Sequence, residues 1–324
     1  MLLLSRRDVE QLLDTGQLVD ALATAMSDLS AGHASAPPRV GARVPERDAV
    51  LGAMPGYSPA VGVLAAKLVT LFPHNTDRPT HQALIAVFDA RTGEPVAVMD
   101  GTAITEARTA ACSALSIRLL ARPDARVLAV LGTGVQARAH ALAATTVHRF
   151  TEVRIAGRDP ARAAALAADL KEQGLPVRAV ESWREASDGA DVVCATTRAQ
   201  DPVVRRAWIG PGVHITSVGS SPHGREVDDA TVASALVVVE HRSTAVLPFP
   251  AGTGDLSEPL SRGLLDTAGI VEIGELVDGR RPGRTSPEQI TLYKSVGIAV
   301  EDVAAVGLVL SAARERGLGQ HFPL

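Results

Sequence analysis

The sequence predicts an α/β fold that contains a doubly wound parallel sheet. A glycine-rich segment that begins at Gly132 directly follows a short apolar strand and opens a helix. From residue 127 to about residue 240, short apolar strands alternate with Ala-rich helices, which is typical of βαβ units. The expected strands span residues 127–131, 153–156, 191–195, 214–218 and 236–240.

The residues before this region follow a different pattern. Ser5 and Asp8 have the spacing of a capping box, and a second helix carries apolar residues at helical spacing from Leu18 to Leu29. From residue 39 to residue 99, apolar runs are separated by turn residues, which predicts an antiparallel sheet with a turn at 91–93. Helices are expected at 102–121 and 298–314, so this part is predicted to be α+β.

The composition is that of an ordinary globular chain, with 324 residues, 46% hydrophobic and 21% charged, and a net charge of −4. A negative balance argues against nucleic acid or an anionic membrane as partner, because both require a concentrated basic face. Cys112 and Cys194 lie far apart and predict neither a metal site nor a disulfide framework. Three leucines near the start are too few for a signal-peptide core. We therefore expect a cytoplasmic protein without a metal.

The glycine-rich segment fits the G-x-G-x-x-A pattern of a dinucleotide-binding loop. Gly132 permits a tight turn, Gly134 lets the backbone approach a pyrophosphate, and Ala137 keeps the helix close to the strand. The N-terminus of that helix offers N–H groups and partial positive charge to the phosphates. We therefore predict a Rossmann-type domain whose phosphate loop consists of Gly132, Thr133, Gly134, Val135, Gln136 and Ala137.

The end of the second strand of this domain bears on the choice of cofactor. An NAD site usually places an acidic residue there to hold the ribose 2′-hydroxyl. Here Gly157 leaves room for a 2′-phosphate, and Arg158 can pair with it, helped by Arg162 one turn later. The alternative is that Arg158 is merely solvated and that Asp159 turns inward to hold NAD. The strand end favours NADPH over NADH.

Further cofactor contacts are expected near the carboxyl ends of later strands, which border the ligand crevice in such sheets. Thr196 directly follows the strand 191–195 and is the first of these candidates. The others are Thr197, Val218, Gly219, Ser295 and Gly297.

Four stretches carry a likeness that is more specific together than any one of them alone. They are Ala65–Val69 with Phe72–Asn75, Glu106–Ala114 running into the Gly132 motif, Ser217–Pro222 with Arg225–Asp228, and Gly252–Leu256 with Gly283, Arg284, Thr291–Gly297 and Glu301–Val303. With these residues, the chain resembles the ornithine cyclodeaminase/mu-crystallin family along nearly its whole length.

The resemblance implies a domain organisation and an activity. Residues 1–118, joined by a C-terminal helix at 298–324, would form a substrate-binding and dimerisation domain, and residues 119–297 the dinucleotide-binding domain. Members are typically homodimers whose N-terminal sheets associate. They bind NAD or NADP, and their reactions pass a hydride to or from an α-amino or imino acid.

The resemblance also implies roles for three basic residues, because Arg39, Lys67 and Arg108 match those that face the substrate in the family. The planar fork of an arginine binds a carboxylate bidentately. Lys67 lies in an otherwise apolar run, where a lowered pKa would let it donate or accept a proton. The alternatives are a Lys67 that reaches solvent and an Arg108 in a structural ion pair.

Four more residues are assigned to the substrate side of the site. Thr80 and His81 follow Pro79, where the family places a small polar residue near the substrate, and His81 could carry protons. Met54 and Ser221 complete the expected substrate-binding set.

One position departs from the cyclodeaminase pattern. Cyclodeaminases carry an aspartate shortly after the glycine that corresponds to Gly219, and this chain has Ser220 and Ser221 there. A serine cannot act as a carboxylate base near neutral pH. We therefore expect an NADPH-dependent reductase of a small cyclic ketimine carboxylic acid. The alternatives are an NAD-dependent ornithine cyclodeaminase, an alanine-type amino-acid dehydrogenase, and a non-catalytic protein that binds NADPH and a small ligand.

Overall fold

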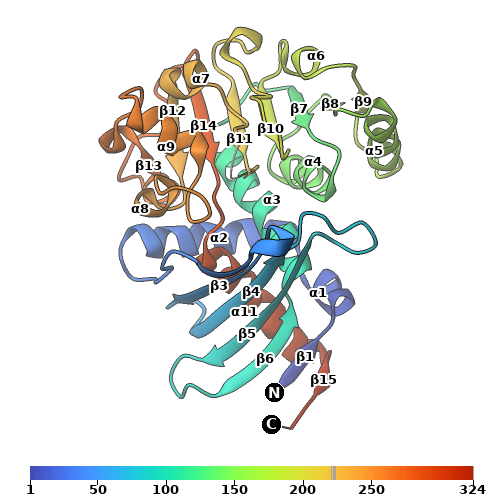
Figure 1. Cartoon of the computed structure of the whole chain (residues 1–324), viewed down its shortest axis with the longest axis vertical. Coiled ribbons are helices and arrows are strands. Elements are labelled where there is room, and N and C mark those ends of the chain that lie inside the picture. The colour runs from blue at the N-terminus through green and yellow to red at the C-terminus, as the bar shows by residue number, and fades with distance from the viewer. Residues whose placement is uncertain (220, 222–223, 324) are drawn as a thin grey trace. The chain divides into compact units, whose positions relative to one another are not determined.

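The computed structural model describes residues 1–219, 221 and 224–323 (Figure 1). The chain folds into two compact units, of which the first comprises Met1–Arg108 with Ile298–Leu324 and the second Thr109–Gly297. The boundary at Arg108 falls inside one long helix, earlier in the chain than the expected boundary at residue 118.

The first unit is built on a sheet with the strand order β15-β1-β6-β5-β4-β3-β2. Strands β2 to β6 pair antiparallel, which confirms the sheet predicted for residues 39–99. The turn between β5 and β6 is also present, since Asp89 accepts hydrogen bonds from the N–H groups of Arg91 and Thr92. The strands are β1 (Leu2–Leu4), β2 (Val40–Val44), β3 (Ala49–Ser58), β4 (Val63–Leu71), β5 (His81–Asp89), β6 (Pro95–Asp100) and β15 (Gln320–His321).

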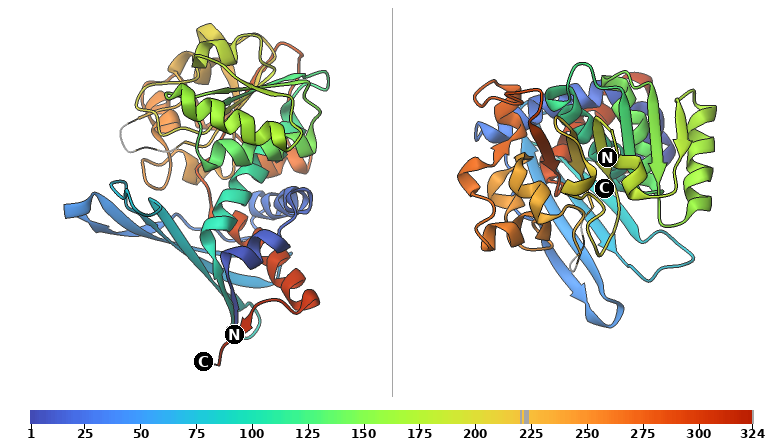
Figure 2. Two further views of the ribbon diagram at one scale, coloured as in Figure 1. Left: turned by 90° about the vertical axis from the view of Figure 1, so that its right-hand side faces the viewer. Right: turned by 90° about the horizontal axis from the view of Figure 1, so that it is seen from above.

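Helices cover one face of this sheet, as the left view of Figure 2 shows. The predicted capping box of Ser5 and Asp8 is confirmed at the first helix. Gly56 in β3 lets the last helix approach closely, because a Cβ there would overlap Ala299 and Val303. The helices are α1 (Arg6–Leu12), α2 (Thr15–Ser30), the start of α3 (Gly101–Leu120) and α11 (Ala299–Arg316), and a 3-10 turn (Pro45–Arg47) joins β2 to β3.

The strand β1 was not expected from the sequence. Leu2–Leu4 pairs in parallel with β6 and antiparallel with β15, so the two ends of the described chain lie side by side. A run of three leucines carries no periodicity of its own, and both of its partners are distant in sequence.

The second unit is a parallel sheet with the order β13-β12-β14-β11-β10-β7-β8-β9. The strand order runs outward from β7 in both directions, which confirms the doubly wound, Rossmann-type fold. The strands are β7 (Val127–Leu131), β8 (Glu152–Ala156), β9 (Val177–Ala179), β10 (Val192–Ala195), β11 (His214–Ser217), β12 (Ala235–Val239), β13 (Val271–Glu272) and β14 (Ile290–Lys294).

Helices flank both faces of this sheet, and two apolar clusters form the core on its two sides (Figure 1). The helices are the rest of α3, α4 (Val135–Val147), α5 (Pro160–Glu172), α6 (Trp183–Ser187), α7 (Asp229–Ser234), α8 (Arg242–Ala245), α9 (Gly254–Ser261) and α10 (Ile273–Val277), with 3-10 turns at Arg206–Trp208 and Thr267–Gly269.

Strands β9, β13 and β14 were not expected from the sequence. Strand β14 lies between β11 and β12, and all five of its residues are buried. It ends in Lys294, and a lysine argues against a buried strand unless its charge has a partner elsewhere in the fold.

No helix in the described part of the chain is long and apolar enough to cross a membrane. Among the described residues, no group of three or more His, Cys, Asp or Glu side chains is arranged to hold a metal ion.

Candidate functional site

The glycine-rich loop connects β7 to α4 at the carboxyl edge of the parallel sheet. Gly132 has a φ of +134°, and a Cβ at this position would collide with the hydroxyl of Thr196. Gly134 is the N-cap of α4 and supplies no side-chain cap, while the space beside its Cα is open. The first N–H groups of α4 are therefore left for an anion, and the loop fits the pyrophosphate of a dinucleotide.

The carboxyl end of β8 lies beside this loop. A Cβ at Gly157 would overlap the methyl group of Thr133, so the glycine lets the two turns pack closely. The Asp159 carboxylate caps α5, with its Oδ1 accepting hydrogen bonds from the N–H groups of Ala161 at 2.9 Å and Arg162 at 3.4 Å. Arg158 and Arg162 are exposed.

Thr196, the first residue after β10, is fixed to the neighbouring strand. Its N–H and its hydroxyl both donate to the carbonyl of Leu131, at 2.9 and 3.0 Å. This places Thr196 directly beside Gly132, as expected from their positions at the ends of adjacent parallel strands.

The next two candidate residues are held by an acid that the sequence analysis did not assign to the site. The buried Glu226 carboxylate accepts hydrogen bonds from the Thr197 hydroxyl at 2.7 Å, the Gly219 N–H at 2.7 Å and the Ser217 hydroxyl at 2.8 Å. It also accepts one from the N–H of Thr197. One carboxylate thus ties together the loops that follow β10 and β11.

A second charged residue that the sequence analysis missed, Lys294, holds the same loop from the other side. Its ammonium group is fully buried and donates to the Gly219 carbonyl at 2.6 Å and to the Ser217 hydroxyl at 3.0 Å. Asp255 balances its charge at 3.0 Å. A lysine at the end of an otherwise apolar run was the available signal for such a pair.

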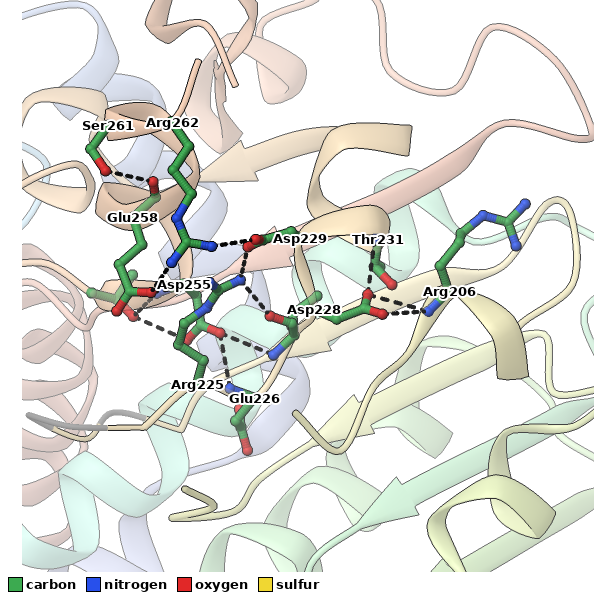
Figure 3. Close-up of polar contacts among 12 residues, drawn as sticks. Arg206, Arg225, Glu226, Asp228, Asp229, Thr231, Asp255, Glu258, Ser261 and Arg262 are labelled. Atoms are coloured by element: carbon green, nitrogen blue, oxygen red, sulfur yellow. Dashed lines mark hydrogen bonds and ion pairs between the residues drawn. The ribbon is translucent and has the colours of Figure 1, made fainter. Parts of the chain in front are cut away.

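Figure 3 shows how the segment that carries Glu226 is anchored. Asp255 accepts hydrogen bonds from the N–H groups of Glu226 at 2.9 Å and Val227 at 3.0 Å. Arg225 pairs with Asp229 and with Glu258 of α9. The position of Glu226 therefore depends on packing between the 225–229 segment and α9.

Two expected cofactor residues, Ser295 and Gly297, are bound to a further buried acid. Glu240 Oε1 accepts hydrogen bonds from the Ser295 hydroxyl at 2.6 Å and from the N–H groups of Val296 and Gly297 at 3.0 Å each. Gly297 has a φ of +67°, a conformation that favours glycine. In this structure the Ser295 hydroxyl is thus directed at Glu240.

The first unit contains a second buried cluster, centred on Lys67. Its Nζ lies 2.9 Å from Asp302 Oδ1 and 2.8 Å from Oδ2, and it donates to the Thr105 hydroxyl at 3.3 Å. Arg108 pairs with Glu301, and its Nε lies 3.3 Å from Asp302 Oδ1. The sequence predicted the two cations, but it did not assign the two carboxylates to the site.

The position of these acids in α11 helps to explain why they tolerate burial. Glu301 and Asp302 lie in the first turn of the helix, where the helix dipole stabilises negative charge. Glu301 also accepts a hydrogen bond from the N–H of Ile298 at 3.3 Å.

Burial in this cluster lowers the pKa of Lys67 to about 8. Asp302 acts in the opposite direction, whereas the positive charges of Arg108 and Arg39 lower the pKa further. A lysine in this state can donate and recover a proton near neutral pH, which an exposed lysine does much less readily.

The remaining substrate candidates lie at different distances from Lys67. Met54 is buried and directly opposite Lys67 in the pairing of β3 with β4, and Arg39 is half-buried before β2. His81 is exposed and pairs with Leu71, four residues along β4 from Lys67, which corresponds to about 13 Å. The fold does not bring His81 next to Lys67.

Thr80 precedes His81 and is half-buried, and Ser221 is half-buried in the second unit. Val218 follows β11 and is half-buried. Ser220, which stands where cyclodeaminases have an aspartate or next to it, lies outside the described residues.

Comparison with known proteins gives a consistent result over the whole chain. A ketimine reductase mu-crystallin of Mus musculus is 38% identical over 314 residues, which cover 94% of this chain and 95% of that protein. The structure of Thermococcus litoralis Delta(1)-pyrroline-2-carboxylate reductase in complex with NADH and L-proline is 35% identical, has a TM-score of 0.94, and is matched over 99% of this chain and 100% of that one.

An archaeal alanine dehydrogenase dimer with bound NAD is 30% identical, has a TM-score of 0.92, and is matched over 99% of this chain and 98% of that one. The family model of the ornithine cyclodeaminase/mu-crystallin family matches residues 1–317. The resemblance stated from the sequence is thereby confirmed, and the chain belongs to the ornithine cyclodeaminase/mu-crystallin family.

Proposed function

We propose that this protein is an NAD(P)H-dependent reductase that converts a small cyclic ketimine carboxylic acid into the corresponding amino acid. The observation that carries the proposal is the buried cluster of Lys67, Arg108, Glu301 and Asp302. The names of the mouse and Thermococcus relatives, a ketimine reductase and a pyrroline-2-carboxylate reductase, support the same reaction class.

The charges of the cluster fit a substrate that carries one carboxylate. Lys67, Arg108 and Arg39 supply three positive charges, and Glu301 and Asp302 supply two negative ones. A substrate carboxylate bound among these cations would itself be paired, as a buried charge requires. Arg108 and Arg39 would bind this carboxylate.

The proton would come from Lys67. Reduction of an imine adds a hydride to carbon and a proton to nitrogen, and the C=N double bond becomes a single bond. The nicotinamide supplies the hydride when it is bound. The Lys67 ammonium would supply the proton and become a neutral amine, which the lowered pKa of Lys67 makes easier near neutral pH.

The cofactor would lie along the carboxyl edge of the parallel sheet. The loop at Gly132 and Gly134 would receive the pyrophosphate, with Ala137 keeping α4 close to the strand, and the loops at Thr196, Thr197 and Gly219 would border the nicotinamide half. NADPH is favoured over NADH because Asp159 is engaged at the N-terminus of α5, while Arg158 is exposed at the strand end.

A homodimer is supported by the outer face of the first sheet. Large apolar side chains are exposed across neighbouring strands, namely Leu51, Leu64, Leu68 and Leu84. Such a patch commonly marks an interface between proteins, and the archaeal alanine dehydrogenase was solved as a dimer. A cytoplasmic location is supported by Cys112 and Cys194, both buried thiols.

The reaction can be tested by following absorbance at 340 nm with purified protein and a ketimine carboxylate of five- or six-membered ring. NADPH and NADH are supplied in parallel reactions. Rapid oxidation of NADPH, with slower oxidation of NADH, is expected. If neither NADPH nor NADH is oxidised with either ring size, the proposed reaction is contradicted.

A second candidate is amino-acid dehydrogenation of the alanine type, favoured by the archaeal structure. Pyruvate with ammonia and NADPH tests it in the same assay. Oxidation of NADPH that requires both pyruvate and ammonia would support amino-acid dehydrogenation. Ornithine with NAD⁺, followed by ammonia release, tests cyclodeamination, which the neutral Ser221 disfavours.

A further inference from the structure

One carboxylate connects the proposed proton donor to the proposed carboxylate-binding arginine. Asp302 lies 2.8 Å from Lys67 Nζ through Oδ2, and its Oδ1 lies 3.3 Å from Arg108 Nε. Lys67 is on β4 and Arg108 on α3, so Asp302 of α11 links two elements that are not neighbours in sequence.

The side chains of Lys67, Arg108 and Asp302 are almost completely buried, so water screens their two contacts very little. Lys67 and Asp302 are each 2% exposed and Arg108 is 5% exposed. Long side chains at a protein surface would sample many rotamers, but here packing and the shared carboxylate restrict both cations. Thr105, which accepts from Lys67 at 3.3 Å, donates its own proton to the Gly101 carbonyl at 2.7 Å.

We propose that Asp302 is a positioning residue for imine reduction: its carboxylate holds the Lys67 ammonium and the Arg108 guanidinium in fixed places and keeps Lys67 charged. This inference rests on the proposed role of Lys67 as proton donor. Asp302 itself touches neither substrate nor cofactor in the proposal and acts through its two partners.

The charges around Lys67 predict how the pKa of Lys67 should change when Asp302 is replaced. Burial, Arg108 on α3 and Arg39 before β2 all lower the pKa of Lys67, and Asp302 raises it. Glu301, next to Asp302 in α11, pairs with Arg108 instead. Without the Asp302 charge, the pKa of Lys67 falls below about 8, so Lys67 loses its proton at a lower pH.

The test is the pH dependence of the single-turnover rate of ketimine reduction with saturating NADPH. In the wild-type protein, the rate falls on the alkaline side as Lys67 loses its proton. Asp302→Asn should move this alkaline limb to lower pH by about one unit or more, and reduce the rate at pH 8 about five-fold or more. An alkaline limb in its wild-type place would overturn the proposal.

Two further variants separate charge from geometry. Asp302→Glu keeps the negative charge and should leave the alkaline limb in place, but it should reduce the rate about five-fold or more because the longer side chain displaces both cations. Glu301→Gln serves as the matched control: it should raise the KM of the ketimine carboxylate without moving the limb. If Asp302→Asn does not fold, a wild-type rate in Asp302→Glu overturns the positioning role.

Failure of the proposed function gives a different result. If Lys67→Met reduces the ketimine within a few-fold of the wild-type rate, Lys67 is not the proton donor, whatever Asp302 does. If Lys67→Met is inactive while the profile of Asp302→Asn is unmoved, only the role of Asp302 is overturned. Circular dichroism of each variant shows whether it is folded.

Discussion

The buried ammonium group of Lys294 donates a hydrogen bond of 2.6 Å to the backbone carbonyl of Gly219. The N–H of the same glycine donates to Glu226 at 2.7 Å. Gly219 is therefore held on both sides by buried charged groups, which fixes the direction of its two peptide planes. A Cβ at this position would overlap the Thr197 carbonyl and Glu226, so no other residue would fit.

Glu226→Gln should weaken the binding of the dinucleotide. An amide has one acceptor where the carboxylate has two, and its NH₂ group would face donors at Thr197 or Gly219. Hydrogen bonds to a charged group contribute about 1.5–3 kcal/mol, so we expect the Kd of NADPH to rise about ten-fold or more. Fluorescence titration with NADPH measures this.

The control for Glu226 is Glu258→Gln, which alters a half-exposed carboxylate in the same network (Figure 3). Exposed ion pairs contribute about 0–1 kcal/mol, and the Kd should stay within a few-fold of the wild-type value. Equal effects of the two variants would mean that Glu226 has no special part in holding the loop.

Gly132 and Gly134 should respond differently to substitution although both belong to the proposed phosphate loop. Gly132→Ala should lower the melting temperature, because it combines a φ of +134° with a collision against Thr196. Gly134→Val should leave the melting temperature nearly unchanged, because its Cβ meets open space, but it should abolish binding of NADPH. If Gly134→Val binds NADPH normally, the pyrophosphate lies elsewhere.

Arg158→Ala should raise the Kd of NADPH about ten-fold or more and change that of NADH little, because only NADPH carries the 2′-phosphate. Arg149 is the matched control, since it is also an exposed arginine but precedes β8, at the opposite edge of the sheet. Arg149→Ala should alter neither constant. A similar loss for both cofactors in Arg158→Ala would contradict its assignment to the 2′-phosphate.

Two buried histidines, His140 and His214, should make the fold sensitive to acid. His140 Nδ1 lies 2.8 Å from the Gln136 carbonyl, so this nitrogen carries the proton, and Nε2 accepts from Ser113 at 2.9 Å. Burial lowers the pKa of His140 to about 4 and, with the charge of Arg284 adding to it, that of His214 to about 3. Both side chains are therefore neutral in the folded protein.

Since the unfolded chain binds protons from about pH 6.5 downward, the stability is complete above that pH and declines as the pH falls towards 4. Each histidine should reduce the free energy of unfolding by about 2 kcal/mol between pH 7 and pH 5. Urea titrations at several pH values measure it. His140→Asn should flatten this dependence, whereas the exposed His33→Asn should not. An unchanged slope in His140→Asn would contradict this origin.

The apolar face of the first sheet should control assembly. Leu68 and Leu84 are cross-strand neighbours and are 37% and 44% exposed. Replacing both by lysine should convert the proposed dimer to a monomer in sedimentation velocity, because it places charge in the middle of the patch. Leu264→Lys, at an equally exposed leucine of the second unit, should not. A dimer that survives the double substitution must form through another face.

The parallel sheet could be predicted because its evidence is local. Apolar runs such as Val127–Leu131, the glycines that follow them and the Ala-rich helices all lie within a few residues of one another. Strand β14 was not predicted because its burial depends on Asp255, a residue of a different segment that pairs with the charged Lys294. A sequence pattern does not record that a charge is neutralised from afar.

The residues of the candidate site also fall into two groups: those that the sequence identifies and those that only the tertiary structure brings together. The sequence by itself identified the glycine-rich loop at Gly132 and, through the family resemblance, Lys67 and Arg108 as candidates, because each is defined by its own neighbours along the chain. Only the tertiary structure brought Asp302 to Lys67, 235 positions along the chain. Burial makes such a pairing obligatory, since a lone buried charge is costly, but the partner is chosen by how the helices pack on the sheet.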